Sequence, residues 1–289
     1  MTISQNKKVS VIVPNYNYGK YLKKRVKTIL DQTYPIYELI ILDDCSTDGS
    51  AELAKNIILD LKLGNPNINI KFVGNDKNSG KAMSQWQKGF ELAKGDYVWI
   101  AEADDLCRKT FLENVMIGFE DEATVISYSE SAVINGRGII IAPNLRFSRD
   151  KEKTGHYKKS YIKNGEDEIK EIMAIRCSIP NVSGVVFKKD TKIPFKKYFT
   201  EALKFQQAGD WYFYVNILKH GKIAYCKKSL NIFRKHHASV TKNSNKTGVH
   251  FGEIKKMQKY IAENYPLSKE TKQFQEKELS RLASRYGII

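Results

Sequence analysis

Apolar and polar positions follow two different periods along the N-terminal third of the chain. Short runs that are mostly apolar and rich in β-branched residues lie at 7–15, 37–44, 68–75 and 96–105. The segments between them place apolar residues three or four positions apart, as at Leu22, Val26 and Ile29. Continuous apolar runs are typical of strands buried on both faces, whereas the wider spacing is typical of amphipathic helices. The pattern therefore predicts four strands that alternate with three helices.

Successive strand–helix units favour an α/β fold with a mostly parallel sheet that is flanked by helices. Right-handed crossovers bring the carboxyl ends of such strands to one edge, where open α/β sheets bind ligands. Polar residues follow all four predicted strands at this edge: Pro14, Asn15 and Tyr16, then Asp43 and Asp44, then Asn78, Ser79 and Gly80, and last Glu102, Asp104 and Asp105. Their coincidence at one edge predicts a binding site there.

The rest of the chain continues these patterns with longer connections. We expect a hairpin from residues 123–134 and 136–143, and a polar, basic, mobile loop over Arg146–Gly165. The later elements are predicted as a strand within 178–190, a helix over 210–221, a strand over 222–230 and charged amphipathic helices from about residue 248 onwards.

The charge balance narrows the choice of partners. The chain carries 48 Lys and Arg residues against 32 Asp and Glu residues, a formal charge of +16. Such an excess favours nucleic acid, an acidic membrane surface or a phosphate-bearing substrate, although solvated surface lysines give the same excess. No zinc-finger spacing or RNP motif supports nucleic acid, so we expect none as a partner.

Cysteine usage and hydropathy indicate the compartment. The four cysteines are far apart and form no CxxC pair, which is typical of reduced, structural thiols. The N-terminal segment lacks a long apolar core, and the apolar run Gly138–Pro143 is far below membrane-spanning length. We therefore expect a cytoplasmic protein, with peripheral contact to the inner face of the cell membrane as a further expectation.

The stretch "VWIAEADDLC" ends a predicted strand in three carboxylates, Glu102, Asp104 and Asp105. Like charges this close repel one another, so a fold that retains them supplies a cation or leaves them in water. An extended backbone would put Glu102 and Asp104 on one face and Asp105 on the other. Such carboxylates suit Mg²⁺, which proteins commonly hold with one or two carboxylates plus phosphate oxygens. The alternative is an exposed acidic turn that caps the next helix.

Asp43 ends the second predicted strand, in "LIILDDCSTDGS". A carboxylate at this edge can accept hydrogen bonds from a ribose hydroxyl or a base N–H. Alternatively, Asp43 and Asp44 organise the turn, with Ser46 or Thr47 as the cap of the next helix. No Gly-x-Gly-x-x-Gly follows the first strand, which argues against a dinucleotide-binding Rossmann domain.

Two later segments carry further candidates. Asp210, in "QQAGDWYFYV", begins a predicted helix, where it can cap the helix and also project into a cleft. The segment "FRKHHASVT" gathers Arg234, Lys235, His236 and His237 beyond a predicted strand. This cluster is either a solvated basic turn or a clamp for a departing diphosphate.

Five segments occur in the order expected of a known family. They are "VSVIVPNYN", "ILDDCSTDGS", "NSGKAMSQWQKGFELAKGDYVWIAEADD", "GDWYFYVNILKHG" and "FRKHHASVT". From Val9 to Thr241 the chain thus resembles family 2 glycosyltransferases with the GT-A fold, of the bacterial surface-polysaccharide type. The C-terminal helices lie outside the resemblance, and the match is poor between Ile141 and Asn181.

The resemblance implies an inverting transfer of a sugar from a nucleoside-diphosphate donor, with Mg²⁺ or Mn²⁺ as cofactor. UDP is the commonest nucleotide in the family, and dTDP is an alternative. The acceptor would be a glycan or a polyprenyl-linked sugar, and contact with an anionic membrane would suit the basic surface. The expected organisation is a GT-A domain over 1–245, with a nucleotide-binding half (1–105) and an acceptor-binding half (106–245), followed by a helical extension (246–289).

The same resemblance places the donor nucleoside at Pro14, Tyr16 and Asp43, with Asn15 and Asn78 as further donor-binding candidates at that edge.

For the chemistry, Asp104 and Asp105 match the end of the motif that binds metal and diphosphate. Asp105 is the preferred metal ligand, and Asp104 and His236 are further candidates. Asp210 matches the catalytic base, while Arg234 and His236 match an element that closes over the diphosphate.

Two positions depart from the family pattern. Glu102 stands where Asp is common, and Gly209 stands where Glu commonly precedes the base. These departures keep open an alternative function, a non-catalytic module that binds sugar nucleotides or glycans. A nucleotidyltransferase would normally have a Gly-rich, basic loop after the first strand, where this chain has "PNYNYGKYL".

Overall fold

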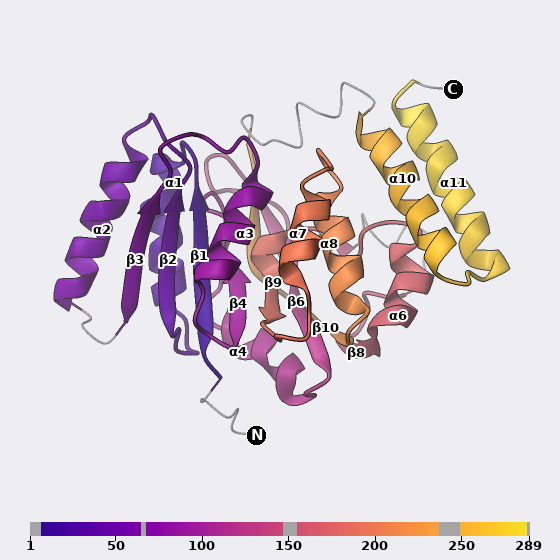
Figure 1. Cartoon of the computed structure of the whole chain (residues 1–289), viewed down its shortest axis with the longest axis horizontal. Helices are drawn as coiled ribbons and strands as arrows, with labels where there is room; N and C mark the ends of the chain where they lie inside the picture. Colours follow the sequence, from indigo (N-terminus) through magenta and orange to yellow (C-terminus); the bar gives the residue numbers. More distant parts are fainter. Residues whose placement is uncertain (1–6, 65–67, 147–154, 237–248, 288–289) are drawn as a thin grey trace.

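The computed structural model describes residues 7–64, 68–146, 155–236 and 249–287. Its centre is one mixed, ten-stranded sheet with the order β3-β2-β1-β4-β9-β6-β10-β5, to which β7 adds on β6 and β8 adds on β10. Helices lie on both faces of this sheet (Figure 1).

The N-terminal half contains the predicted strand–helix units. The strands are β1 (Val9–Asn15), β2 (Glu38–Asp43), β3 (Asn69–Gly74) and β4 (Tyr97–Ile100), and the helices are α1 (Gly19–Leu30), α2 (Ser50–Gly64) and α3 (Ala82–Leu92). β1 pairs in parallel with both β2 and β4, and β2 pairs in parallel with β3. The prediction of parallel strands with their carboxyl ends at one edge is therefore confirmed.

Successive side chains of these strands enter two apolar cores, one on each face of the sheet. Ile12 and Ile100 pack with residues of α3, whereas Val13 and Trp99 pack with residues of α1 and α2. Because both faces are covered, these strands are apolar at almost every position instead of at every second one.

The second half of the sheet is mixed. β9 (Val185–Lys188) is antiparallel to β4 and β6, and β10 (Lys222–Lys235) is parallel to β6 (Thr124–Asn135). The predicted hairpin is present, because β7 (Ile140–Ala142) pairs antiparallel with β6. The other elements are β5 (Leu106–Cys107), β8 (Tyr161–Asn164), α4 (Phe111–Met116), η1 (Ile117–Glu120), α6 (Gly165–Glu168), the π-helical η2 (Ile169–Met173), η3 (Val182–Gly184), α7 (Phe195–Ala202) and α8 (Gly209–Leu218).

Two predictions of local structure are wrong. The strand that was expected to extend to residue 105 ends at Ile100, and the backbone N–H of Asp105 donates to the carbonyl of Glu102 at 3.2 Å. This turn separates the three carboxylates, because it directs Asp105 into the protein interior. The segment Arg146–Gly165 is not a loop throughout, because Tyr161–Asn164 forms β8 at the edge of β10. Residues 147–154 of that segment lie outside the described residues.

The expected C-terminal helices are α10 (Val249–Asn264) and α11 (Lys269–Arg285), which lie side by side in Figure 1. Ile254, Met257 and Ile261 of α10 are buried in the same core cluster as residues of α8. The Ser268 hydroxyl accepts from the backbone N–H of Thr271 and caps α11. The proposed boundary at residue 245 stays a prediction. In the part of the chain that the structure describes, no helix is long and apolar enough to cross a bilayer.

Candidate active site

The acidic turn at the end of β4 meets the carboxyl end of β10. Asp105 is buried, and its carboxylate accepts hydrogen bonds from the backbone N–H of Arg234 (2.8 Å) and from Nδ2 of Asn181 (3.0 Å). Burial and the neighbouring charge of Asp104 raise the pKa of Asp105. The side chain therefore holds β10 against the turn, and its role as the preferred metal ligand stays a prediction.

Asp104 is the more accessible carboxylate of the turn. Its Oδ2 lies 2.9 Å from Nε2 of His236, and its Oδ1 has no hydrogen bond within the described residues. The ring of His236 contacts those of Tyr18 and Tyr21, each with a centroid separation of 5.6 Å. The two side chains belong to segments 132 residues apart that the sequence singled out separately, and the fold brings them together.

Arg234 lies beside this pair. Its Nε donates to the carbonyl of Asp104 (2.7 Å) and its Nη1 to the carbonyl of Asn135 (3.2 Å), while its guanidinium stacks on the ring of Tyr21 at 4.6 Å. Within the described residues Nη2 makes no hydrogen bond, so one donor remains for an anion. His237 and the rest of "HASVT" lie outside the described residues.

Glu102 behaves differently from the two aspartates. It accepts a hydrogen bond from Nε1 of Trp86 at 2.6 Å. Burial, together with the charge of Asp104, raises the pKa of Glu102 to about 8. Glu102 is therefore largely protonated at neutral pH, and the turn carries less negative charge than its three carboxylates suggest.

Arg25 is a basic group that the sequence reasoning missed. It is fully buried on α1 and stacks on Trp99 at 5.1 Å, and none of its guanidinium nitrogens has a hydrogen-bond partner within the described residues. Its charge opposes the rise in the pKa of both Glu102 and Asp105. The fold thus places a permanent cation beneath the acidic turn. Its position on the apolar face of an amphipathic helix is the only signal of it in the sequence.

The first two strands end in a network around Asp43. Asn15 donates to Asp43 Oδ1 (2.6 Å) and to the hydroxyl of Ser50 (2.8 Å), and the backbone N–H of Ser46 donates to Asp43 Oδ2 (2.9 Å). Asp43 thus organises the turn, which is the alternative that its sequence context left open. A contact between Asp43 and a nucleoside stays a prediction.

Two neighbours of this network differ in exposure. Pro14 is buried within β1, opposite Leu42 of β2. Tyr16 is 45% exposed just beyond the end of β1. Of Pro14 and Tyr16, Tyr16 is therefore the predicted donor-binding residue that a ligand can reach directly.

Asp44 organises the next loop. Its carboxylate accepts from Nδ2 of Asn75 (2.6 Å), from the backbone N–H and hydroxyl of Ser79 (2.9 and 2.7 Å) and from Nε2 of Gln85 (2.8 Å). Asn78 donates to the backbone carbonyl of Asp44 at 3.0 Å. The loop that carries the candidate Asn78 is therefore fixed to the end of β2.

Asp210 lies in the first turn of α8, which begins one residue earlier at Gly209, so it is not the capping residue. Burial raises the pKa of Asp210 to about 6, with a smaller contribution from the charge of Glu253. Tyr214, one turn further along α8, is buried. Burial is the main cause of its raised pKa, and the charges of Asp210 and Glu102 raise the pKa further. Helix α3 links the two segments, because Trp86 donates to Glu102 and Met83 comes within 3.5 Å of a Cβ position at Gly209, next to Asp210.

The backbone that leads into Asp210 is held from two sides. Glu253 of α10 accepts hydrogen bonds from the backbone N–H groups of Gln206, Gln207 and Ala208, at 2.7, 2.7 and 2.9 Å. Lys81, next to the donor-side loop, donates to the carbonyl of Leu203 and to that of Phe205 (3.2 Å). Neither contact could be predicted from the sequence, because Glu253 is one charged residue among many on an amphipathic helix.

The close approach of α7 to α8 leaves no room at Gly209 for the Glu that is common in the family at this position. A Cβ at this position would lie 2.6 Å from the carbonyl oxygen of Ala202, closer than real Cβ contacts come. The end of α7 and the start of α8 approach too closely for any side chain at residue 209. In this chain the nearby carboxylate comes instead from Glu253.

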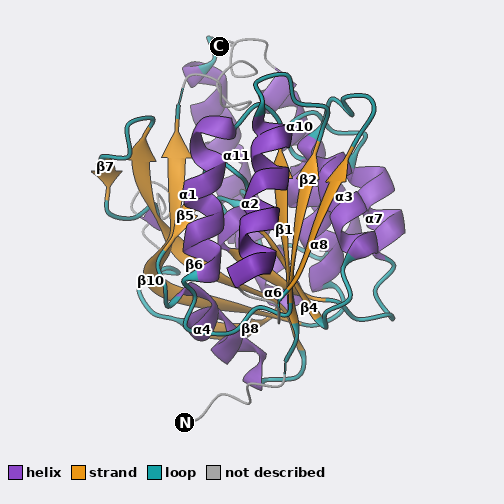
Figure 2. Ribbon diagram, turned by 90° about the vertical axis from the view of Figure 1, so that its left-hand side faces the viewer, coloured by secondary structure: helices purple, strands orange, loops and turns teal. Residues whose placement is uncertain are grey.

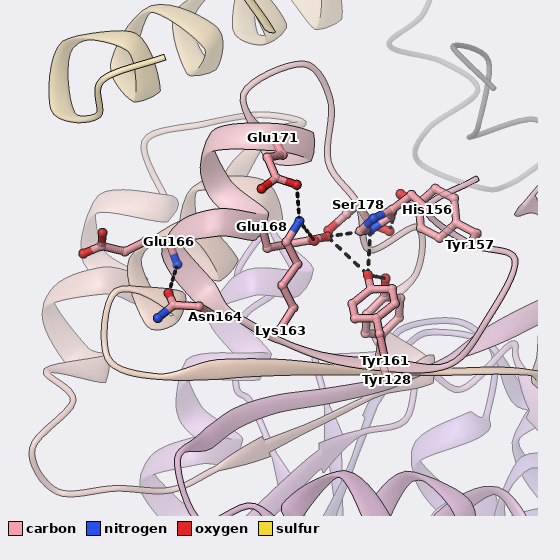
Figure 3. Close-up of polar contacts among 10 residues, drawn as sticks. All are labelled: Tyr128, His156, Tyr157, Tyr161, Lys163, Asn164, Glu166, Glu168, Glu171 and Ser178. Carbon is pink, nitrogen blue, oxygen red and sulfur yellow. Dashed lines mark hydrogen bonds and ion pairs between the residues drawn. The ribbon is translucent and has the colours of Figure 1, made fainter. Parts of the chain in front are cut away.

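A second buried polar cluster lies in the predicted acceptor-binding half (Figure 3). Oε1 of Glu168 lies 3.2 Å from Nε2 of His156, the hydroxyl of Tyr161 lies 2.7 Å from the same nitrogen, and Lys163 lies 3.6 Å from Oε2 of Glu168. Burial opposes ionisation of Glu168, but His156 and Lys163 outweigh it and lower the pKa of this carboxyl. These contacts fasten β8 to α6, which accounts for the strand where a loop was expected.

The donor atoms at the acidic turn suit a hard divalent cation. Asp104 and His236 offer one carboxylate and one imidazole, and no group of three or more His, Cys, Asp or Glu side chains within the described residues forms a metal site. Mg²⁺ is commonly held by one or two carboxylates plus substrate phosphates, so such a sparse donor set fits a cation that arrives with a diphosphate. The residues therefore fit a cation shared with a substrate better than a closed structural site.

Comparison with known proteins decides the family. The family described as "Glycosyl transferase family 2" matches residues 10–179. The chain belongs to this family. It is 34% identical over 121 residues to the "Putative teichuronic acid biosynthesis glycosyltransferase TuaG" of Bacillus subtilis, which covers 42% of this chain and 45% of the relative.

A second relative is the "Poly(ribitol-phosphate) beta-N-acetylglucosaminyltransferase TarP" of Staphylococcus aureus. It is 34% identical over 136 residues, which cover 46% of this chain and 39% of that protein. The aligned part thus spans less than half the length of these curated relatives.

Solved structures agree on the fold. The crystal structure of S. aureus TarS 1–349 with UDP-GlcNAc matches with a TM-score of 0.65 and 18% identity, over 96% of this chain and 73% of that one. The mannosyltransferase PcManGT from Pyrobaculum calidifontis, in complex with GDP-Man and Mn²⁺, matches with a TM-score of 0.57 and 13% identity, over 100% of this chain and 78% of that one. The expected GT-A-type α/β fold with C-terminal helices is therefore confirmed.

Proposed function

We propose that this glycosyltransferase-family chain transfers a sugar, with inversion, from a nucleoside-diphosphate donor to an acceptor of surface polysaccharide synthesis. The observation that carries the proposal is the arrangement at one edge of the sheet. There the Asp104–His236 pair lies just beyond β4 and β10, and α3 contacts both the acidic turn, through Trp86, and the start of α8 beside Asp210, through Met83.

Asp210 is the base. With a pKa of about 6 it is mostly ionised at neutral pH, and it is more basic than an ordinary aspartate. It takes the proton of the attacking acceptor hydroxyl, a contribution typically of about 10²–10⁴-fold. The segment just before α8, held by Glu253 and Lys81, fixes the direction from which it acts.

Asp104 and His236 would hold Mn²⁺ or Mg²⁺ together with the donor diphosphate. When bound, such a cation stabilises the charge that develops on the departing diphosphate. Arg234, whose Nε is bonded to the carbonyl of Asp104, would add a charge-assisted hydrogen bond to the same group through Nη2. Asp105 positions Arg234, because it accepts from the backbone N–H of that residue.

The nucleotide lies along the ends of β1 and β2. The exposed ring of Tyr16 contacts the base, and Asp43 with Asn15 forms the polar floor beside it. Asn78 and Pro14 shape the neighbouring parts of the site. We take UDP as the nucleotide, since the TarS structure of the same fold contains UDP-GlcNAc. A dTDP-sugar is the alternative, because Asp43 can pair with either pyrimidine.

The acceptor is a glycan or a polyprenyl-linked sugar. TuaG is named for teichuronic acid biosynthesis, and TarP for transfer to poly(ribitol-phosphate). The formal charge of +16 suits anionic acceptors and an anionic membrane equally well. We therefore place the protein in the cytoplasm, in peripheral contact with the membrane where lipid-linked acceptors are elongated.

The test is a donor panel. UDP-, dTDP- and GDP-sugars are incubated with the chain and Mn²⁺, and the free nucleoside diphosphate is measured with and without acceptor. We expect release from one nucleotide class, and loss of that release in Asp210→Asn with donor binding retained. Wild-type turnover in Asp210→Asn would remove this residue from the role of base.

A non-catalytic module that binds sugar nucleotides is the second candidate. Gly209 favours it, because a Cβ there would lie 2.6 Å from the carbonyl oxygen of Ala202, so no side chain can stand beside Asp210 at this position. This function predicts nucleotide binding without turnover for every donor and acceptor tested.

A further inference from the structure

Three consecutive isoleucines are exposed at one edge of the molecule. Ile139, Ile140 and Ile141 are 59%, 58% and 55% exposed. Consecutive side chains of a strand point to opposite faces, so a strand inside a covered sheet would bury at least one of them. β7, which contains Ile140 and Ile141, projects at the outer edge of the sheet in Figure 2, beyond the helices that cover its faces. Contiguous exposed apolar residues of this kind mark interaction surfaces.

A basic helix face lies next to this hairpin. Lys20, Lys23 and Lys24 of α1 are exposed, and the helix contains no acidic residue between its first and last positions. Within the described residues these three lysines form no ion pair. The side chain of Tyr21, on the same helix, comes within 3.9 Å of a Cβ position at Gly136 in the hairpin turn.

Two more cations flank the isoleucines. Arg137 lies in the hairpin turn, and Lys235 lies at the end of β10; both are exposed. The edge therefore combines an apolar tip with a basic rim. We name the surface made by Ile139–Ile141, Lys20, Lys23, Lys24 and Arg137 the hairpin surface.

We propose that the hairpin surface docks on an anionic lipid bilayer. Apolar side chains at such an interface enter the boundary between head groups and acyl chains, while lysines remain among the anionic head groups. A soluble polyanion would pair with the lysines but would leave the isoleucines in water. A second copy of the chain would cover the isoleucines but would bring the lysine faces of both copies together, which like charges oppose.

Docking in this way would bring the candidate active site close to the membrane, and the meaning of that closeness rests on the proposed function. A Cβ at Gly136 would lie 3.5 Å from Cβ of His236, and one at Gly138 would lie 3.9 Å from Nη1 of Arg234. The hairpin turn thus borders the residues proposed to hold the donor diphosphate. A bilayer under the hairpin surface places that site beside the head groups, where a polyprenyl-linked acceptor carries its sugar.

The test is vesicle flotation of the full chain without any donor, so its result does not depend on glycosyl transfer. One set of vesicles contains phosphatidylcholine alone, and the other contains equal parts of phosphatidylcholine and phosphatidylglycerol. Three variants are compared with the wild type: Ile139→Ser with Ile140→Ser and Ile141→Ser; Lys20→Gln with Lys23→Gln and Lys24→Gln; and the control Leu59→Ser. Leu59 is a 60% exposed apolar residue of α2, away from the hairpin surface.

We expect the wild type to float with the anionic vesicles only. The lysine variant loses about 100-fold in affinity, since each lysine near an anionic surface contributes about 1 kcal/mol. The isoleucine variant loses at least about tenfold, which follows from the removal of apolar area from the bilayer boundary. Leu59→Ser binds as the wild type does, and all variants keep the wild-type melting temperature because every substituted side chain is exposed.

Three outcomes would overturn the proposal. The first is the absence of wild-type flotation with anionic vesicles. The second is a loss in Leu59→Ser as large as that in the isoleucine variant. The third is a wild-type dimer in sedimentation that the isoleucine substitutions dissociate while vesicle binding is unchanged, which would identify a second copy as the occupant. If the protein releases nucleoside diphosphate but does not float with vesicles, the proposed function stands and the membrane-docking proposal is wrong.

Discussion

Replacing Glu253 by Gln tests whether the C-terminal helices take part in catalysis. The carboxylate of Glu253 accepts three backbone N–H groups within 2.9 Å, from the residues just before the helix that carries Asp210. The amide of Gln keeps the size of the side chain, removes its charge and turns one acceptor into a donor that faces an N–H group.

The magnitude follows from these bonds. Hydrogen bonds to charged groups contribute about 1.5–3 kcal/mol each, and the substitution breaks at least one of them. We expect the free energy of unfolding to fall by about that amount. Displacement of the base lowers the transfer rate by about 10–100-fold, because each 1.4 kcal/mol of lost transition-state stabilisation corresponds to tenfold.

The pH dependence separates a role in positioning the base from a loss of stability alone. The charge of Glu253 contributes to the raised pKa of Asp210, which is about 6. Removing that charge lowers the pKa of Asp210, so the acidic limb of the pH–rate profile moves to lower pH. A purely structural defect would lower the rate at every pH and leave the limb in place.

The assay is the initial rate of nucleoside diphosphate release between pH 4.5 and 8.5, at saturating donor. Glu263→Gln is the matched control, because Glu263 lies on the same helix, exposed and paired with Lys259 at 3.7 Å. The control should behave as the wild type does. If the acidic limb of the pH–rate profile is unshifted in Glu253→Gln and the rate stays within about twofold of the wild type, Glu253 does not position the base.

Four further substitutions test other parts of the site. Asp210→Asn should keep donor affinity and lose about 10²–10⁴-fold in transfer. Because the pKa of Asp210 rises on folding from 3.8 to about 6, its contribution to stability is present below pH 4 and is lost as the pH rises through 6. The same variant should therefore melt higher than the wild type at pH 8 and not at pH 3.5, in thermal melts at both values. His236→Ala should abolish the effect of Mn²⁺ on UDP affinity, measured by calorimetry. Gly209→Glu restores the residue common in the family, but its Cβ would meet the carbonyl of Ala202. Denaturant unfolding should therefore show that the free energy of unfolding falls by about 1–3 kcal/mol, and the transfer rate should not rise. Arg25→Met removes the cation that opposes the rise in the pKa of Asp105, so an NMR titration of that carboxyl should move to higher pH.

The sheet and its functional edge could be predicted from the sequence because they depend on local pattern. Strands buried on both faces must be apolar at nearly every position, and the helices between them show one apolar stripe. The crossover rule then brings the ends of β1 to β4 together without any knowledge of tertiary contacts. For this reason the sequence indicated Asn15, Asp43, Asn78 and Asp104 as one group.

The roles of individual side chains within that group depend on geometry that no short pattern contains. A single turn buries Asp105 and leaves Asp104 partly exposed beside His236, whereas the sequence pattern predicts an extended backbone there. Glu253 accepts from the backbone of Gln207, 46 residues away along the chain, so no local signal identifies it. Arg25 lies in the apolar stripe of α1, and the sequence pattern alone does not show that its guanidinium is buried and stacks on Trp99.

The proposed reaction depends on a divalent cation that Asp104 and His236 would bind together with a donor diphosphate. Isothermal calorimetry of UDP binding, with and without Mn²⁺, tests it most directly on the wild type and on Asp104→Asn. We expect Mn²⁺ to strengthen UDP binding to the wild type and to have no effect on UDP binding to Asp104→Asn. Equal UDP affinity with and without Mn²⁺ in the wild type, or an undiminished effect of Mn²⁺ on the variant, would contradict it.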